Sequence, residues 1–204
     1  GQTGENLVRF ACIVTDLARA FGRCGIGAVM GSKNLKAIAI RGTKGIDVAD
    51  MKTHLEAVNE ALQSLYSNPN YEFQAKFGTM ALQSISAELG WLPIKNFTEG
   101  EFKGITKIDG ETFLQDFYIK NKACFGCALH CGHYFAVKRS QFAGTEGEGT
   151  EFVNVEALGT KVGNENFPSI LKAHNLCNQY GLDTEETGDV IAFAMECYEK
   201  GVIN

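Results

Sequence analysis

Three of the seven cysteines crowd into eight residues, in the order Cys124-Phe-Gly-Cys127-Ala-Leu-His-Cys131. Gaps of two and three residues let thiolates from one short loop converge on a single inorganic centre, and such gaps recur in cysteine-ligated [4Fe–4S] sites. Gly126 allows the backbone to turn tightly there, and the apolar neighbours Phe125, Ala128 and Leu129 are expected to shield the centre from water. The spacing therefore favours Cys124, Cys127 and Cys131 as cluster ligands.

Two other interpretations of the same loop stay open. His130 or His133 would give a zinc ion its fourth ligand, although structural zinc sites usually show two paired halves. The loop can also hold three thiols without any metal. Cys177 and Cys197 fall on predicted apolar helix faces, where a cysteine is more often part of the core than a ligand. A fourth cluster ligand is therefore expected beyond residue 204.

A second candidate site is the glycine-rich segment Gly22-Arg-Cys-Gly-Ile-Gly-Ala-Val-Met-Gly-Ser-Lys33. A dinucleotide-binding turn must open a helix, and a strand pattern from Leu35 predicts no room for one. A P-loop needs Gly-Lys-Ser/Thr, whereas this chain has Gly31-Ser32-Lys33. What remains is an unobstructed backbone between Arg23 and Lys33. Such a backbone suits a phosphorylated cofactor, or it is only a connection between two strands.

The elements that must position these residues change character near residue 46. Before it, apolar and alternating patterns predict strands over 7–14 and 35–41. After it, the spacing of Leu55, Val58, Leu62 and Leu65 places them on one helix face. We therefore expect an α+β protein, with residues 1–46 ending a β-rich domain and residues 47–204 forming a mainly helical one. Further helices are predicted over 71–89, 111–121, 154–162, 167–180 and 184–200, with a short strand over 134–138.

Composition limits the class of protein. The 204 residues are 45% hydrophobic and 21% charged, which is typical of a chain that buries a core. The net charge of −5 argues against a general nucleic-acid binder. No apolar run predicts a membrane span or a signal peptide, and the cysteine usage indicates a reducing, cytoplasmic compartment. The chain lacks an initiator methionine and stops after a predicted helix, so we expect an internal fragment.

Two stretches of the sequence resemble a known family. Gly4-Glu-Asn-Leu-Val-Arg-Phe-Ala, followed by the glycine segment and Asn34-Leu-Lys-Ala-Ile, is similar to the N-terminal domain of the tungsten-containing aldehyde:ferredoxin oxidoreductases. The C-x2-C-x3-C loop followed by Gly181-Leu-Asp-Thr184 is similar to their helical second domain. The resemblance implies tungsten or molybdenum held by two pterins, with a [4Fe–4S] cluster beside one of them.

The resemblance also implies roles for single residues. Arg23, Cys24 and Gly25 match the part that holds the pterin phosphates and their bridging Mg²⁺, through a backbone carbonyl that tolerates a cysteine. The family's second pterin motif, Asp-x-x-Gly-Leu-Asp, is here Asn178-Gln-Tyr-Gly181-Leu182-Asp183. Asp183 would accept hydrogen bonds from the pterin, while Asn178 departs from the family's aspartate. Asp183-Thr-Glu-Glu186 also has the pattern of a capping box that opens a helix.

The resemblance further implies a reaction. Glu151-Phe152 matches a family segment whose glutamate lies near the metal, and a raised pKa in a dry pocket would suit it as a proton carrier. A solvated acidic loop is the alternative.

Two segments, Phe21–Gly27 and Glu146–Glu156, are more similar in sequence to the tungsten subunit of class II benzoyl-CoA reductase. That branch of the family reduces aromatic rings in anaerobic degradation. We favour that branch, with aldehyde oxidation and a non-catalytic iron–sulfur or zinc module as alternatives. The resemblance implies ferredoxin or electron-transfer subunits as partners. It implies an aromatic acyl-CoA or an aldehyde as the substrate, and an oligomer as the full-length form.

Overall fold

A computed structural model describes all 204 residues and shows an α+β fold, as expected. The helices and strands are α1 (Gln2–Glu5), β1 (Ile13–Thr15), β2 (Arg19–Phe21), α2 (Ile26–Ser32), α3 (Met51–Tyr66), α4 (Tyr71–Phe77), α5 (Leu82–Glu88), α6 (Gly110–Asp116), β3 (Tyr118–Lys122), β4 (Gly132–Ala136), β5 (Glu146–Glu148), α7 (Phe152–Leu158), α8 (Phe167–Tyr180) and α9 (Thr184–Glu199). Three 3₁₀ turns join them: η1 (Gly78–Ala81), η2 (Ile105–Lys107) and η3 (Thr160–Val162). No helix is long and apolar enough to cross a lipid bilayer.

The hydrophobic core lies in the helical part, against the three-stranded sheet β3-β4-β5. Eleven buried side chains form it, and they come from η1, α6, β4, α7, α8 and the segments beside them. Burying large aliphatic and aromatic side chains is the main favourable contribution to folding here. The members are Met80, Ile108, Phe113, Phe117, Phe135, Val137, Val155, Leu158, Phe167, Ile170 and Leu171.

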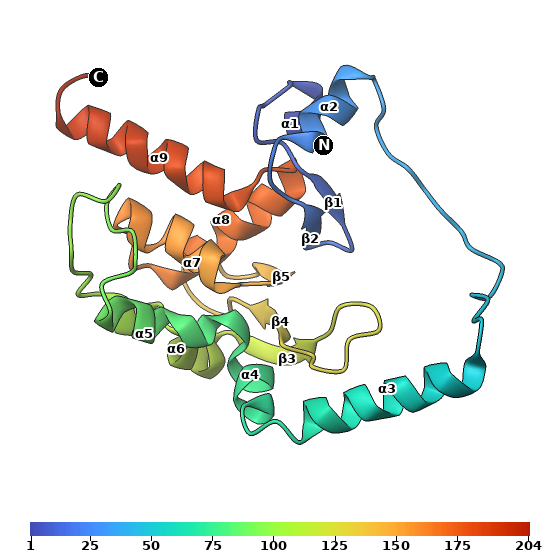
Figure 1. The fold of residues 1–204 in the computed structure, drawn as a ribbon. Coiled ribbons are helices and arrows are strands. Elements are labelled where there is room, and N and C mark those ends of the chain that lie inside the picture. The colour runs from blue at the N-terminus through green and yellow to red at the C-terminus, as the bar shows by residue number, and fades with distance from the viewer.

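The N-terminal segment packs against the end of α8 rather than against this core. In the antiparallel hairpin β1-β2, Ile13 faces Phe21, and α1 lies beside α2 (Figure 1). A backbone bridge pairs Ala11 with Leu182. The Cys12 amide also donates to the Gly181 carbonyl at 2.8 Å. These bonds fix the N-terminal segment beside the turn between α8 and α9.

Helix α3 stands away from the rest of the chain in Figure 1. Its N-cap is Asp50, whose side chain accepts hydrogen bonds from the amides of Lys52 and Thr53, and none of the helix residues is buried. Residues 36–49 lead to it without a single backbone–backbone hydrogen bond. The helix itself was predicted from its apolar spacing, and this prediction is confirmed.

Three predictions for the N-terminal segment are wrong. The strand expected over 7–14 is reduced to β1. Helix α2 follows Gly25 directly, although we predicted no room for a helix there. No strand forms over 35–41, because this segment finds no partner strand to complete a hydrogen-bonded ladder.

In the helical part, α8 has the predicted bounds and α9 differs by one residue. The helix predicted over 71–89 is divided at Gly78, where φ is +57° and a side chain would collide with the Cys131 carbonyl. The helix predicted over 111–121 ends at Asp116, and its second half forms β3 against β4. Tertiary pairing overrides the local helical pattern there.

Candidate functional site

The three clustered cysteines lie on the loop that joins β3 to β4. Gly126 takes a left-handed conformation (φ +70°), and the Cys127 amide donates to the Cys124 carbonyl at 3.0 Å, so the loop turns tightly as predicted. Cys124 and Cys127 are exposed, and Cys131 is half-buried. The predicted shield is incomplete, since Phe125 is fully exposed. The three thiols do not converge into a metal-binding group in this structure.

Glu151 lies close to the third of these cysteines. Burial and then the charge of Glu151 raise the pKa of the Cys131 thiol. The Glu151 carboxylate accepts a hydrogen bond from the Thr79 hydroxyl at 2.5 Å, and its amide donates to the Asn154 side chain at 2.9 Å. Glu151 is therefore a fixed, half-buried residue at the start of α7 rather than a member of a solvated loop.

Arg19 and His174 belong to the same polar cluster, and the sequence analysis did not single them out. Arg19 on β2 lies 3.5 Å from a Glu148 carboxylate oxygen and 3.8 Å from one of Glu151. The buried ring of His174 has its Nε2 3.1 Å from the Glu148 carbonyl and 3.1 Å from the Asn178 amide nitrogen. Burial lowers the pKa of His174. For His174, the sequence offered one signal: His174 and Asn178 are four residues apart on one predicted helix, a spacing that lets their side chains meet. The sequence offered no such signal for Arg19.

The glycine segment and the 178–183 motif come together, although about 155 positions separate them in the chain. The Arg23 guanidinium pairs with Glu186, and its Nε lies 3.6 Å from the Asp183 carboxylate. Cys24 and Gly25 both have left-handed backbones, at φ +71° and +69°. This pair of residues turns the chain from β2 into α2, directly after Arg23, which contacts Asp183.

The residues of the second motif have distinct local tasks. Gly181 ends α8 with φ +80°, and Leu182 joins the bridge to Ala11. One oxygen of Asp183 accepts from the Glu185 amide at 3.0 Å, so Asp183 caps α9. The other half of the predicted capping box does not form, because the Asp183 amide donates to the Phe10 carbonyl and Glu186 pairs with Arg23. The other oxygen of Asp183, Oδ2, is buried and has no hydrogen-bond partner. Asn178 bonds His174 and borders a cavity.

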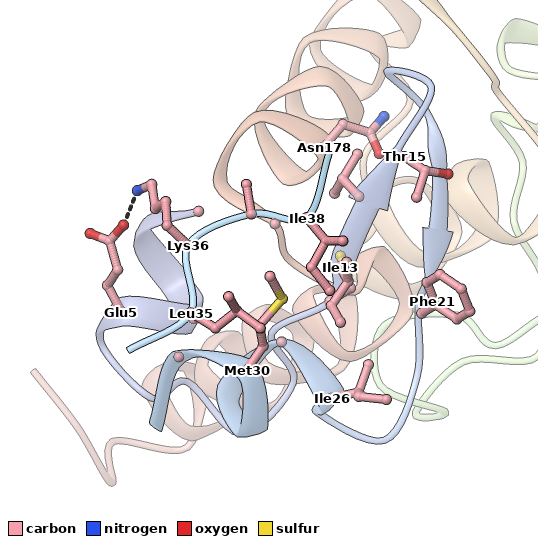
Figure 2. A pocket seen from close by; sticks show the side chains of 18 of the residues that line it. Glu5, Ile13, Thr15, Phe21, Ile26, Met30, Leu35, Lys36, Ile38 and Asn178 are labelled. Atoms are coloured by element: carbon pink, nitrogen blue, oxygen red, sulfur yellow. Dashed lines mark hydrogen bonds and ion pairs between the residues drawn. The ribbon is translucent and has the colours of Figure 1, made fainter. Parts of the chain in front are cut away.

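That cavity, of about 610 Å³, lies between α1, β1, α2, residues 35–40 and the end of α8. Figure 2 shows an apolar lining that includes Ile13, Met30 and Leu35, with Asn178 at one side and the Glu5–Lys36 ion pair at another. Cys12 and Gly181 also border it, whereas the three clustered cysteines do not. The cavity is therefore separate from the cysteine loop.

Two models of known protein families match separate parts of this chain. Residues 1–42 match the family model for the N-terminal domain of aldehyde ferredoxin oxidoreductase, and residues 56–204 match the model for domains 2 and 3 of the same enzyme. The chain belongs to the aldehyde ferredoxin oxidoreductase family. Both parts of the resemblance, the glycine segment and the cysteine loop with its downstream motif, fall inside the matched regions.

Curated relatives align over all of this chain. The tungsten-containing aldehyde ferredoxin oxidoreductases of Pyrococcus furiosus and Thermococcus kodakarensis are 43% and 40% identical to it. The WOR-like subunit of the aliphatic sulfonate oxidoreductase of Pyrococcus furiosus is 29% identical. The chain spans about a third of the length of these relatives, 32–33% in each case.

A solved structure shares the fold. The active-site complex BamBC of benzoyl coenzyme A reductase, in complex with 1,5-dienoyl-CoA, superposes with a TM-score of 0.76 at 23% identity. The match covers all of this chain and 32% of the other one. At that identity the comparison supports the architecture, and the substrate has to be argued from other observations.

Proposed function

We propose that this chain is part of the catalytic subunit of a tungsten-dependent oxidoreductase that oxidises aldehydes to carboxylic acids and passes electrons to a ferredoxin-type carrier. The observation that carries the proposal is the 43% identity, over the whole chain, to a protein named as a tungsten-containing aldehyde ferredoxin oxidoreductase. The site supports it independently, because a cysteine loop, a carboxylate and a phosphate-compatible turn lie on adjoining elements.

The residues beside Asp183 fit a pterin cofactor. The buried Oδ2 of Asp183 makes no hydrogen bond and lies 3.6 Å from the Arg23 Nε, so it is paired in charge and can still accept a hydrogen bond from a pterin N–H. The Cys24–Gly25 turn offers backbone groups, and Arg23 offers a positive charge, toward pterin phosphates and a bridging Mg²⁺. Gly181 and Leu182 set the position of Asp183. When bound, a tungsten bis-pterin supplies the two-electron oxidation of the substrate.

The cysteine loop fits three ligands of a [4Fe–4S] cluster by the chemistry of its donors. Thiolates at Cys124, Cys127 and Cys131 would hold the cluster, and the exposure of the first two leaves them open to it. Neither Cys177, which is buried, nor Cys197 on α9 adds a fourth thiolate on this loop. We therefore assign the fourth ligand to another part of the protein.

Glu151 is the residue best placed to handle protons. Thr79 holds one of its carboxylate oxygens and Arg19 stands near the other, so the carboxylate has one orientation. In the proposed reaction Glu151 accepts a proton from the water that adds to the aldehyde carbonyl. Its position near Cys131 keeps that proton transfer close to the path of the electrons.

Reduction of an aromatic acyl-CoA is the second candidate function. The sequences of two segments, Phe21–Gly27 and Glu146–Glu156, favour the benzoyl-CoA reductase branch of the family, in which electrons flow toward the substrate. The names of the relatives at 40–43% identity favour aldehyde oxidation instead. We rank aldehyde oxidation first because those alignments cover the entire chain, whereas the resemblance to the benzoyl-CoA reductase branch rests on the sequences of two short segments.

Metal analysis and one pair of assays test the proposal. A full-length protein containing this chain, purified without oxygen, is expected to hold iron, sulfide and tungsten, and to reduce ferredoxin when an aldehyde is added. Donor-dependent reduction of benzoyl-CoA without aldehyde activity would support the second candidate. Zinc as the only metal would contradict both.

A further inference from the structure

Arg19 on β2 lies between the carboxylates of Glu148 and Glu151, two residues that follow the cysteine loop in the chain. Its guanidinium nitrogens are 3.5 Å from Glu148 and 3.8 Å from Glu151, and its side chain is only 27% exposed. Its Nε is buried without a hydrogen-bond partner. An arginine that is mostly buried between acids is held by its charge pairs, and its removal leaves those acids uncompensated.

The same arginine lies on the side of Gly132 where a side chain would stand. One guanidinium nitrogen lies 2.9 Å from the place where a Cβ on Gly132 would stand, and Gly132 directly follows Cys131. On the other side, a Cβ on Gly78 would lie 2.5 Å from the Cys131 carbonyl oxygen. The next residue, Thr79, donates to Glu151. Arg19 and Thr79 therefore hold Glu151 from two elements that both contact the end of the cysteine loop.

The two carboxylates differ in how much they depend on Arg19. Glu148 has a second cation, because the Lys122 ammonium lies 3.4 Å from its other oxygen. Glu151 has no other cationic side chain within 4 Å. Loss of Arg19 would thus leave Glu148 paired and Glu151 as an unbalanced negative charge near Cys131.

We propose that Arg19 is a positioning residue that holds Glu151 beside Cys131 and balances its charge, so that the reduction potential of a cluster on this loop depends on Arg19. The inference rests on the proposed function, since it assumes a cluster on the cysteine loop. An added electron makes a cluster more negative, and an unbalanced carboxylate nearby opposes that step. The β1-β2 hairpin would in this way tune a centre that is carried by the other part of the chain.

The test compares variants of the full-length protein in a redox titration of the cluster followed by EPR. Arg19→Gln should keep the cluster signal and make reduction harder by on the order of tenfold, which is about 59 mV for a one-electron couple. Arg19→Gln combined with Glu151→Gln should return the potential close to that of the unaltered protein. Arg19→Lys should shift it less than Arg19→Gln. Lys107→Gln, which breaks an exposed ion pair between η2 and Glu165 that includes neither Arg19, Glu148 nor Glu151, is the matched control and should leave the potential unchanged.

Two results would overturn the inference. One is a potential that does not change in Arg19→Gln while the cluster signal persists. The other is a crystal structure of Arg19→Gln in which the Glu151 carboxylate keeps its place, a readout that needs no cluster. Absence of a cluster signal from the unaltered protein counts against the proposed function, and the position of Glu151 in the variant crystal then decides the role of Arg19 by itself.

Discussion

At the scale of single residues, Gly25 shows why the glycine segment has its composition. Its φ of +69° is unfavourable for other residues, and a Cβ would lie 2.0 Å from the Arg9 carbonyl oxygen. We expect Gly25→Ala to destabilise the protein by about 2–3 kcal/mol, since both strain and collision must be relieved. Because the same turn adjoins Asp183, the variant should also bind less pterin. Thermal unfolding and pterin content measure the two effects.

Gly22 is the matched control for that experiment. It lies three positions earlier on the same segment, and a Cβ there would meet no atom within 4 Å. Gly22→Ala should therefore change stability by less than about 0.5 kcal/mol. Equal losses in the two variants would show that the turn at Gly25 has no special role.

At the scale of elements, one buried lysine fixes α9 to α7 and η3. The Lys161 side chain is 2% exposed, and its ammonium lies 3.3 Å from Glu156 and 2.8 Å from Asp189 and pairs also with Glu185. Burial by itself lowers the pKa of Lys161, but the hydrogen bonds to Asp189 and Glu185 outweigh it and raise that pKa. Three acids surround one cation, so the helices depend on this charge.

Replacing that lysine should therefore be costly. Lys161→Met is expected to lose about 3–5 kcal/mol at neutral pH, because the acids remain without their partner. Burial, and then the charge of Glu185, raise the pKa of Glu156. Its folded-state pKa lies above the unfolded one, so ionised Glu156 costs stability at neutral pH and that cost is relieved as the pH falls through the folded-state pKa. The loss in Lys161→Met should shrink accordingly, and urea unfolding at two pH values measures it. A loss that does not vary with pH would contradict this account.

At the scale of the whole molecule, local patterns predicted what depends on local chemistry. The bounds of α8 follow from the Asn166 cap and the Gly181 stop, and α3 follows from its apolar spacing. Patterns failed where distant partners decide: Tyr118–Lys122 forms a strand because β4 pairs with it. Likewise the cysteine loop was visible in the sequence, whereas Arg19 joins the site only through contacts with residues more than a hundred positions away.

The proposed cluster belongs to this same scale, because we assign its fourth ligand to another part of the protein and this chain spans about a third of the relatives' length. Cys127→Ser in the full-length protein should abolish the visible absorption of the cluster, since a serine replaces one of the thiolates of the loop. Cys197→Ser is the control, because Cys197 lies on α9, away from the loop, and its loss should leave the absorption intact. Absorption that persists in Cys127→Ser would remove Cys127 from the ligand set. Absorption that disappears in Cys197→Ser as well would mean that α9 contributes the fourth ligand, and that the cluster joins the loop to the C-terminal helix rather than to another part of the protein.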